Sequence, residues 1–303
     1  MKNLLLIYLS IMVFSASGQT LEPLWQGNMP NSKGVAVADV DDNGRMRQVG
    51  TPGYYVFKPS KEENKGAVVV ICPPGGYSHL TYDIAGFQLA KWFNTIGVTA
   101  VVLFHRLPHS PDLVQREIGP LQDLQRMMKI VRARAEEWGI DPERVGVMGC
   151  SAGGHLAASI GTTATDYSRV GDRYDDLPWS SDFTILVSPV ITLGEKAHSG
   201  SRDNLLGKNA SPELVRQFSC ELNVTPQTSP AFLAHANDDP AVPVENSILF
   251  YSALHAQGVN ASLHVFPYGG HNIALRNNPG STQLWVLLCE AWLYEMDIIN
   301  VKE

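Results

Sequence analysis

A serine held between two glycines is the first candidate for chemistry in this sequence. Gly149, Ser151 and Gly153 form a G-x-S-x-G pattern, which follows a short apolar run at 145–148 and precedes a stretch able to form a helix. A strand, a tight turn and a helix in that order make a nucleophile elbow, which raises one hydroxyl above a parallel sheet. The glycines are required because side chains there would collide with the neighbouring strand and helix. We therefore predict that Ser151 is a nucleophile.

A serine hydroxyl also needs a base to take its proton and an acid to fix the tautomer of that base. Where the serine lies on such an elbow, the acid and then the base follow it along the chain, each after a strand. Two adjacent aspartates, Asp238 and Asp239, follow an apolar run at 231–235. The D-x-x-V-P pattern that is common at this point in α/β-hydrolases begins at Asp239 and favours it over Asp238. His271 follows the last predicted strand, so we predict a triad of Ser151, Asp239 and His271.

Attack on a carbonyl further requires N–H donors for the developing oxyanion. One donor is the residue after the nucleophile, Ala152. The second is expected in the loop after the apolar run 67–72, whose two prolines are excluded because proline has no N–H. Gly76 is the best candidate there, and Gly75 and Tyr77 are its neighbours. Tyr77 could instead bind substrate on the leaving-group side of the pocket.

The elements that must position these residues alternate along the chain. Runs of continuous apolar residues, as at 67–72 and 98–104, are typical of strands buried on both faces of a parallel sheet. Further strands are expected at 54–57, 145–148, 183–187, 231–235 and 261–266, with helices at 83–94, 120–138, 244–257 and 282–294. This order predicts an α/β-hydrolase fold, with a mostly parallel central sheet and helices on both faces. Asp123, near the start of the second helix, is expected to interact with the helix dipole rather than to act as a catalytic acid.

A long polar segment interrupts this alternation at about residues 191–230. It contains no predicted strand and one predicted helix, at 212–218. A segment of that length after the sixth strand of such a sheet usually covers an active site. We therefore expect a single domain over residues 19–303, with the cap segment as part of it.

The N-terminus has the features of a targeting sequence. Lys2 precedes an apolar run at 4–14, and small residues follow at 16–18. These features predict a signal peptide over residues 1–18, too short to span a membrane. No cysteine precedes Cys72, which argues against a lipid anchor. We expect a secreted or periplasmic protein without a membrane anchor.

Composition narrows the possible partners. The net charge is -7 at pH 7 and no basic cluster is present, which argues against nucleic acid and anionic lipid and suits neutral esters of sugars. The four cysteines lack metal-binding spacing and are not expected to pair. The stretch from Asp39 to Gly44 resembles the start of a calcium loop, but Gly50 stands where the twelfth-position Glu would be, which favours a turn. We expect no metal and no cofactor.

Several stretches in order resemble the exported α/β-hydrolase esterases grouped with acetylxylan and feruloyl esterases. They lie at 71–77, 139–145, 149–155, 201–207 and 239–247, within a resemblance that covers about residues 66–292. The resemblance implies hydrolysis of carboxylic esters on decorated plant polysaccharides, without a cofactor. It also implies a Ser-Asp-His triad, which it places on Ser151, Asp239 and His271.

Four functions are compatible with such a site. The first is removal of O-acetyl groups from a polysaccharide such as xylan, since the polar segment 191–230 does not indicate a large apolar slot. The second is hydrolysis of feruloyl or other small esters. A peptidase of the prolyl-oligopeptidase type uses the same triad but usually carries a propeller domain, and none is evident before residue 50. A binding protein that has lost catalysis would typically lack the serine or the histidine.

Overall fold

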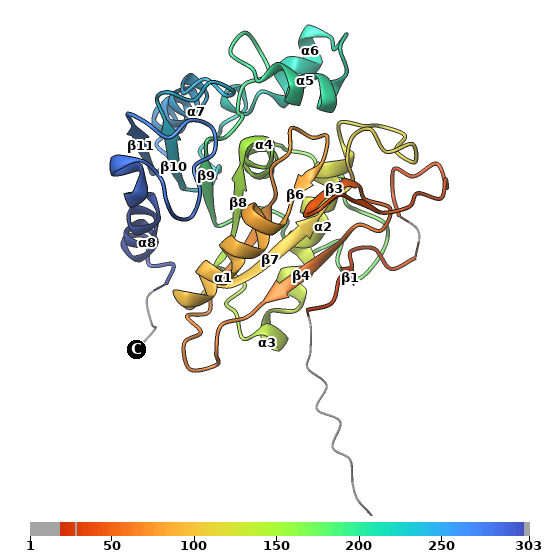
Figure 1. Ribbon diagram of the computed structural model, residues 1–303. Coiled ribbons are helices and arrows are strands. Elements are labelled where there is room, and N and C mark those ends of the chain that lie inside the picture. Colours follow the sequence, from red (N-terminus) through yellow and green to blue (C-terminus); the bar gives the residue numbers. More distant parts are fainter. Residues whose placement is uncertain (1–18, 28, 300–303) are drawn as a thin grey trace, which may run out of the picture.

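A central sheet of eight strands organises the computed structural model, which describes residues 19–27 and 29–299. Its strand order is β1-β4-β7-β5-β8-β9-β10-β11 (Figure 1). The strands are β1 (Glu22–Pro23), β4 (Gly53–Phe57), β5 (Val68–Cys72), β7 (Thr99–Phe104), β8 (Val145–Cys150), β9 (Phe183–Val187), β10 (Ala231–Ala236) and β11 (Ala261–Phe266). All neighbours from β7 to β11 are parallel, whereas β4 and β1 add antiparallel pairs at one edge. The predicted α/β-hydrolase fold with a mostly parallel sheet is confirmed.

Helices cover both faces of this sheet because its strand side chains alternate between two apolar layers. Val68 and Val70 of β5 pack into one core cluster, and Val69 and Ile71 into the other. The first cluster includes side chains of α2 (Gly119–Ala133), α3 (Ala135–Trp138), α4 (Ser151–Ile160) and α7 (Glu245–Ala256). The second includes side chains of α1 (Gln88–Thr95) and α8 (Trp285–Glu295). α1 is preceded by a π-helical turn, η1 (Asp83–Phe87), and α8 by a 3₁₀ turn, η3 (Gly280–Leu284).

A second, smaller sheet was not predicted from the sequence. It consists of β2 (Val40–Asp41), β3 (Arg45–Gln48) and β6 (Leu80–Thr81), and the stretch from Asp39 to Gly44 supplies its hairpin turn. The Asp41 carboxylate accepts a hydrogen bond from the Gly44 N–H at 3.2 Å and another from the Tyr82 hydroxyl. Asp39 accepts the Gly50 N–H at 2.6 Å. The aspartates of this stretch therefore hold the turn together, and within residues 19–27 and 29–299 no three metal-ligating side chains cluster.

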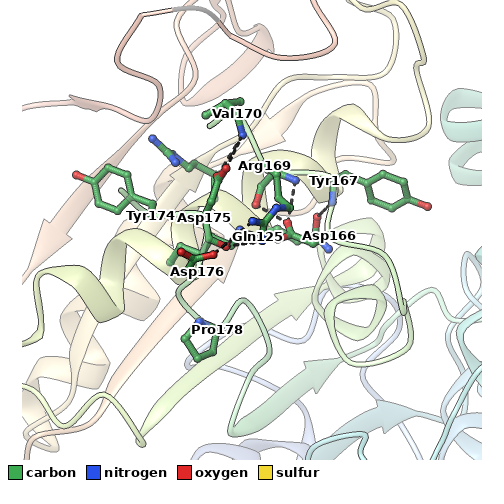
Figure 2. Close-up of polar contacts among 12 residues, drawn as sticks. Gln125, Asp166, Tyr167, Arg169, Val170, Tyr174, Asp175, Asp176 and Pro178 are labelled. Carbon is green, nitrogen blue, oxygen red and sulfur yellow. Dashed lines mark hydrogen bonds and ion pairs between the residues drawn. The ribbon is translucent and has the colours of Figure 1, made fainter. Parts of the chain in front are cut away.

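The polar side of α2 is buried as well as its apolar side. The connection 161–182 between α4 and β9 lies over it (Figure 2). Buried Lys129 of α2 pairs with Asp166 at 2.6 Å, and buried Arg126 pairs with Asp172. Gln125 exchanges hydrogen bonds with the same connection, accepting the Tyr167 N–H at 2.8 Å. Charged side chains become buried here because each has a charged partner.

Asp123 of α2 also differs from its prediction. Its carboxylate is fully buried and lies beyond the first turn of the helix. It accepts hydrogen bonds from the Arg106 backbone N–H at 2.7 Å, the Arg106 guanidinium at 2.7 Å and the Trp25 indole at 2.8 Å. The expected interaction with the helix dipole is therefore wrong, because Asp123 is instead the acceptor that satisfies a buried arginine.

The cap segment follows β9, the sixth strand of the central sheet along the chain, and lies at the end of the sheet opposite α3 (Figure 1). It contains α5 (Ser199–Leu206), α6 (Pro212–Phe218) and a 3₁₀ turn, η2 (Cys220–Leu222). Only α6 was expected. α5 begins Ser-Gly-Ser, a weak helix former, and is capped by the His198 side chain, which accepts the Ser201 N–H.

Two further sequence expectations concern export and cysteine pairing. The proposed signal peptide, 1–18, lies outside the described residues. Across the part of the chain that the structure does describe, no helix combines the length and hydropathy needed to cross a bilayer. All four cysteines are free thiols.

Candidate active site

The turn from β8 into α4 holds Ser151 in a left-handed conformation, with φ of +53°. Its glycine neighbours make this turn possible. A Cβ on Gly149 would lie 2.0 Å from the carbonyl oxygen of Gly153, and one on Gly153 would lie 2.1 Å from that of Cys72. No larger residue fits at either position. A non-glycine residue held at positive φ by its surroundings is typical of functional sites.

His271 connects Ser151 to Asp239. Its Nε2 lies 2.9 Å from the Ser151 Oγ, and its Nδ1 lies 2.7 Å from the Asp239 Oδ2. An ionised carboxylate only accepts hydrogen bonds, so Nδ1 carries the proton of the neutral ring and Nε2 accepts from the serine hydroxyl. The structure thus brings the three predicted triad residues together in the geometry that nucleophilic activation requires.

The Asp239 side chain is fully buried yet ionised. Burial alone would raise the pKa of this carboxyl group. Hydrogen bonds from His235, His271 and two backbone N–H groups outweigh burial and hold its pKa well below the usual range. The backbone donors are Ala241 and Val242, each 2.9 Å from Oδ1. Asp239 therefore remains an acceptor for His271 across the pH range in which that base works.

Asp238, the rejected neighbour, serves the loop that carries the base. Its carboxylate accepts the N–H of Gly270 at 2.8 Å, next to His271. Among the residues that the structure describes, its carboxylate makes no hydrogen bond with the imidazole ring itself. The structure therefore gives the two adjacent aspartates different partners, Asp239 the ring and Asp238 the backbone.

His235 is a residue that sequence reasoning missed. It is fully buried in β10, and its Nε2 lies 3.1 Å from the Val242 carbonyl oxygen and 3.3 Å from the Asp239 Oδ2. A carbonyl only accepts, so Nε2 carries the proton, and Nδ1 accepts from the Ser247 hydroxyl at 2.8 Å. His235 thus donates to the same oxygen as the base. Nothing in the sequence marks this role, because the residue precedes the acid inside a strand.

The two predicted oxyanion donors flank the nucleophile. Ala152 is the second residue of α4, directly after Ser151, in the first turn where N–H groups lack intrahelical partners. Gly76 has a φ of +61° and lines the same cleft as Ser151. Its carbonyl accepts the Asn204 side-chain N–H at 2.8 Å, so helix α5 of the cap holds the Gly76–Tyr77 peptide group, directly after the Gly76 N–H. Asn204 was not singled out from the sequence, although it lies within the stretch 201–207 that carries the family resemblance.

Tyr77 requires a correction. Its side chain is buried in the core rather than in the lining of the cleft. Its hydroxyl donates to the Nδ1 of His155 at 2.7 Å, and the His155 Nε2 donates to the Phe218 carbonyl at 2.7 Å. Burial lowers the pKa of His155 to about 4. Tyr77 therefore connects the oxyanion loop to α4 and to the end of α6, and the substrate-binding role predicted for its side chain is not what the structure shows.

The cleft above Ser151 has a volume of about 580 Å³. Polar side chains of the cap, His198 and Asn204, line one part of it. The cleft also has an apolar part that the polar cap segment did not lead us to expect, because it comes from other elements; it includes Ile84, Leu89, Val187, Ile273, Leu275 and Trp285. Cys150 also reaches the cleft, but burial raises the pKa of its thiol to about 12 and keeps it un-ionised.

A parallel sheet with a serine at a glycine-flanked turn, followed along the chain by its acid and its base, defines the α/β-hydrolases that use a serine nucleophile. Within that class the chain belongs to the BD-FAE family, which matches residues 55–254. The chain is thus an α/β-hydrolase of this family.

Two curated proteins similar to this chain are an acetylxylan esterase and a xylanase. The chain is 36% identical over 238 residues to an acetylxylan esterase of Xylanibacter ruminicola, covering 77% of this chain and 45% of the relative. It is 31% identical over 227 residues to endo-1,4-beta-xylanase B of Butyrivibrio fibrisolvens, covering 75% of this chain and 35% of that protein. The chain therefore spans less than half the length of these relatives.

Among solved structures, the chain is similar to an acetyl ester-xyloside bifunctional hydrolase from Caldicellulosiruptor lactoaceticus. The two share 34% identity and a TM-score of 0.78, over 93% of this chain and 97% of the other. A carboxylesterase from Lactobacillus plantarum, at 23% identity and a TM-score of 0.70, shares the fold.

Proposed function

We propose that the protein is an exported serine carboxylesterase that removes O-acetyl groups from a plant polysaccharide such as xylan. The observation that carries this proposal is the continuous hydrogen-bonded chain from Ser151 through His271 to Asp239 at the floor of an open cleft. The similarity to an acetylxylan esterase and to an acetyl ester-xyloside hydrolase supports the choice of substrate. The acidic net charge of the chain suits an uncharged polymer.

Acylation follows from the geometry. The Ser151 hydroxyl passes its proton to the His271 Nε2, 2.9 Å away, as Oγ bonds to the ester carbonyl carbon. The N–H groups of Ala152 and Gly76 stabilise the negative oxygen of the tetrahedral intermediate. Collapse of the intermediate breaks the bond to the sugar oxygen, which leaves with the proton from Nε2. The acetyl group remains on Ser151.

Deacylation repeats these steps with water. His271 takes a proton from a water molecule, whose oxygen attacks the acetyl carbon, and then returns the proton to the Ser151 Oγ as acetate leaves. Asp239 stays ionised throughout, because its hydrogen bonds stabilise the charged form. Its role is to hold the Nδ1 proton and to stabilise the imidazolium formed in each half-reaction.

Acetate release from acetylated xylan, compared with ferulate release from a feruloylated xylan, tests the proposal. We expect acetate release, and we expect Ser151→Ala to reduce it at least about 10³-fold, since the triad acts as a unit. Ferulate release without acetate release would refute the acetyl assignment. Hydrolysis of p-nitrophenyl acetate with neither polysaccharide attacked would refute the polysaccharide assignment.

A feruloyl esterase is the second candidate, and one observation favours it. The apolar side of the cleft, which includes Ile273, Leu275 and Trp285, offers an aromatic acyl group a surface that the sequence did not indicate. The same pair of substrates separates the two candidates.

Export rests on the first eighteen residues, where Lys2, the apolar run 4–14 and small residues at 16–18 support a cleaved signal peptide. N-terminal sequencing of protein recovered outside the cytoplasm should begin at Gln19. Recovery with Met1 still in place would contradict this part of the proposal.

A further inference from the structure

We propose that His198 selects for the alcohol half of the substrate, by donating a hydrogen bond from Nε2 to a hydroxyl next to the acetylated carbon of a sugar ring. The inference rests on the proposed function and assigns to the cap a residue that recognises the sugar.

His198 lies where the cap meets the catalytic residues. It precedes α5 and lines the same cleft as Ser151 and His271. A Cβ added to Gly76 would lie 3.9 Å from its Cε1 atom, so the edge of the imidazole ring faces the oxyanion loop. Burial first, and then positive charge on His271, lower the pKa of His198. The second effect places His198 within electrostatic range of the base.

The tautomer of His198 is fixed by its role as a helix cap. Its Nδ1 accepts the backbone N–H of Ser201 at 3.2 Å, and the Ser201 hydroxyl lies 2.8 Å from the same atom. An amide N–H can only donate, so the proton of the neutral ring is on Nε2. Among residues 19–27 and 29–299, no side chain or carbonyl accepts a hydrogen bond from that Nε2–H. The cap therefore presents an oriented, neutral donor to the cleft.

The alcohol half of the ester is the part of the substrate that such a donor fits. His271 must reach the leaving oxygen to protonate it, so the sugar lies beside His271 and hence near His198. The carbonyl oxygen is already served by the N–H groups of Gly76 and Ala152, and the acetyl methyl group has no acceptor atom. A sugar carries hydroxyl oxygens on the carbons next to the ester, and a neutral N–H suits these uncharged acceptors.

The variant His198→Asn separates recognition from helix capping. Asparagine is a preferred N-cap residue, so its side-chain oxygen can still accept the Ser201 N–H, but it cannot reach the former Nε2 position. kcat/KM is measured on a monoacetylated methyl xyloside and on analogues that lack one hydroxyl beside the acetylated carbon. The wild-type protein should favour the parent xyloside over one analogue by about tenfold, the range of one neutral hydrogen bond, and His198→Asn should treat the two alike within about twofold.

A second variant, His198→Ala, removes both the cap and the donor. It should lose the same preference as His198→Asn and should also have a lower Tm, since an N-cap is lost. If His198→Ala loses the preference but His198→Asn keeps it, the effect comes from helix capping and the inference is overturned. An unchanged preference in both variants would also overturn it.

The proposed function can fail separately. A wild-type protein that hydrolyses p-nitrophenyl acetate but no acetylated xyloside would overturn the polysaccharide assignment, and the role of His198 with it. A wild-type protein that deacetylates the xyloside and all its analogues equally would overturn the role of His198 alone.

Discussion

Replacing Asp239 with asparagine should convert His271 into the wrong tautomer. The Oδ1 of Asp239 accepts two backbone N–H groups, those of Ala241 and Val242, each at 2.9 Å. An amide nitrogen cannot accept these bonds, so the oxygen of the new asparagine must take this position. Its NH₂ group then replaces Oδ2, 2.7 Å from the His271 Nδ1.

This orientation allows an estimate of the loss. Facing a donor, Nδ1 becomes an acceptor, the ring proton moves to Nε2, and Nε2 can no longer take the proton of Ser151. The corresponding substitution in a triad of this type lowers kcat about 10⁴-fold, which equals about 5 kcal/mol of transition-state stabilisation. Initial rates on p-nitrophenyl acetate measure the effect, and Tm shows whether the variant is folded.

Asp238→Asn is the matched control for this prediction. Within the described part of the chain Asp238 accepts only the Gly270 N–H, at 2.8 Å, and an asparagine oxygen can keep that bond. We expect kcat within about fivefold of wild type, because such a bond contributes little. The reasoning would be refuted if Asp239→Asn kept more than a tenth of the wild-type kcat while folded. Equal losses in the two variants would refute it as well.

Two further predictions concern residues around the oxyanion loop. Burial lowers the pKa of His155 from 6.5 to about 4, so the unfolded chain takes up a proton that the folded protein does not. The free energy of unfolding should therefore fall as the pH is lowered from 6.5 to 4, by about 3 kcal/mol in total, because protonation favours the unfolded chain. Above pH 6.5 His155 is neutral in both states and this loss is absent. Urea unfolding across this range should show a weaker pH dependence for His155→Gln, and an equal dependence would contradict the assignment. Asn204→Ala frees the Gly76 carbonyl and should lower kcat about tenfold with less effect on KM, since an oxyanion donor is disordered; an unchanged kcat would show that the loop is held without it.

Local sequence signals located the groups that meet in the triad. Ser151 stands between glycines at a strand-to-helix turn, and Asp239 and His271 each follow an apolar strand, so their order along the chain reflects the order of strands in a parallel sheet. The same apolar runs predicted the central sheet, because strands buried on both faces must be apolar throughout.

The residues that sequence reasoning missed or misplaced depend on contacts that no sequence pattern marks. His235 supports Asp239 only because the loop after β10 folds back over the strand. Tyr77 was expected in the pocket, but its partner, His155, lies 78 positions away in the chain. Helix α5 was missed because its cap is a histidine rather than one of the usual capping residues. Contacts of these kinds leave no periodic pattern in the sequence.

The position of the base at the rim of the sheet has a consequence for how the protein fails on heating. In the described part of the chain β11 pairs with β10 alone, and most of its side chains are partly exposed, whereas β8, which leads to Ser151, lies mid-sheet. Opening free energies within a protein run from near zero at its margins to the global value at its centre. Partial detachment of β11 would separate His271 from Ser151 while the central strands stay paired. Catalysis therefore depends on the edge strand β11, one of the less stable parts of the sheet. We expect activity to be lost at a lower temperature than that at which the central strands unfold.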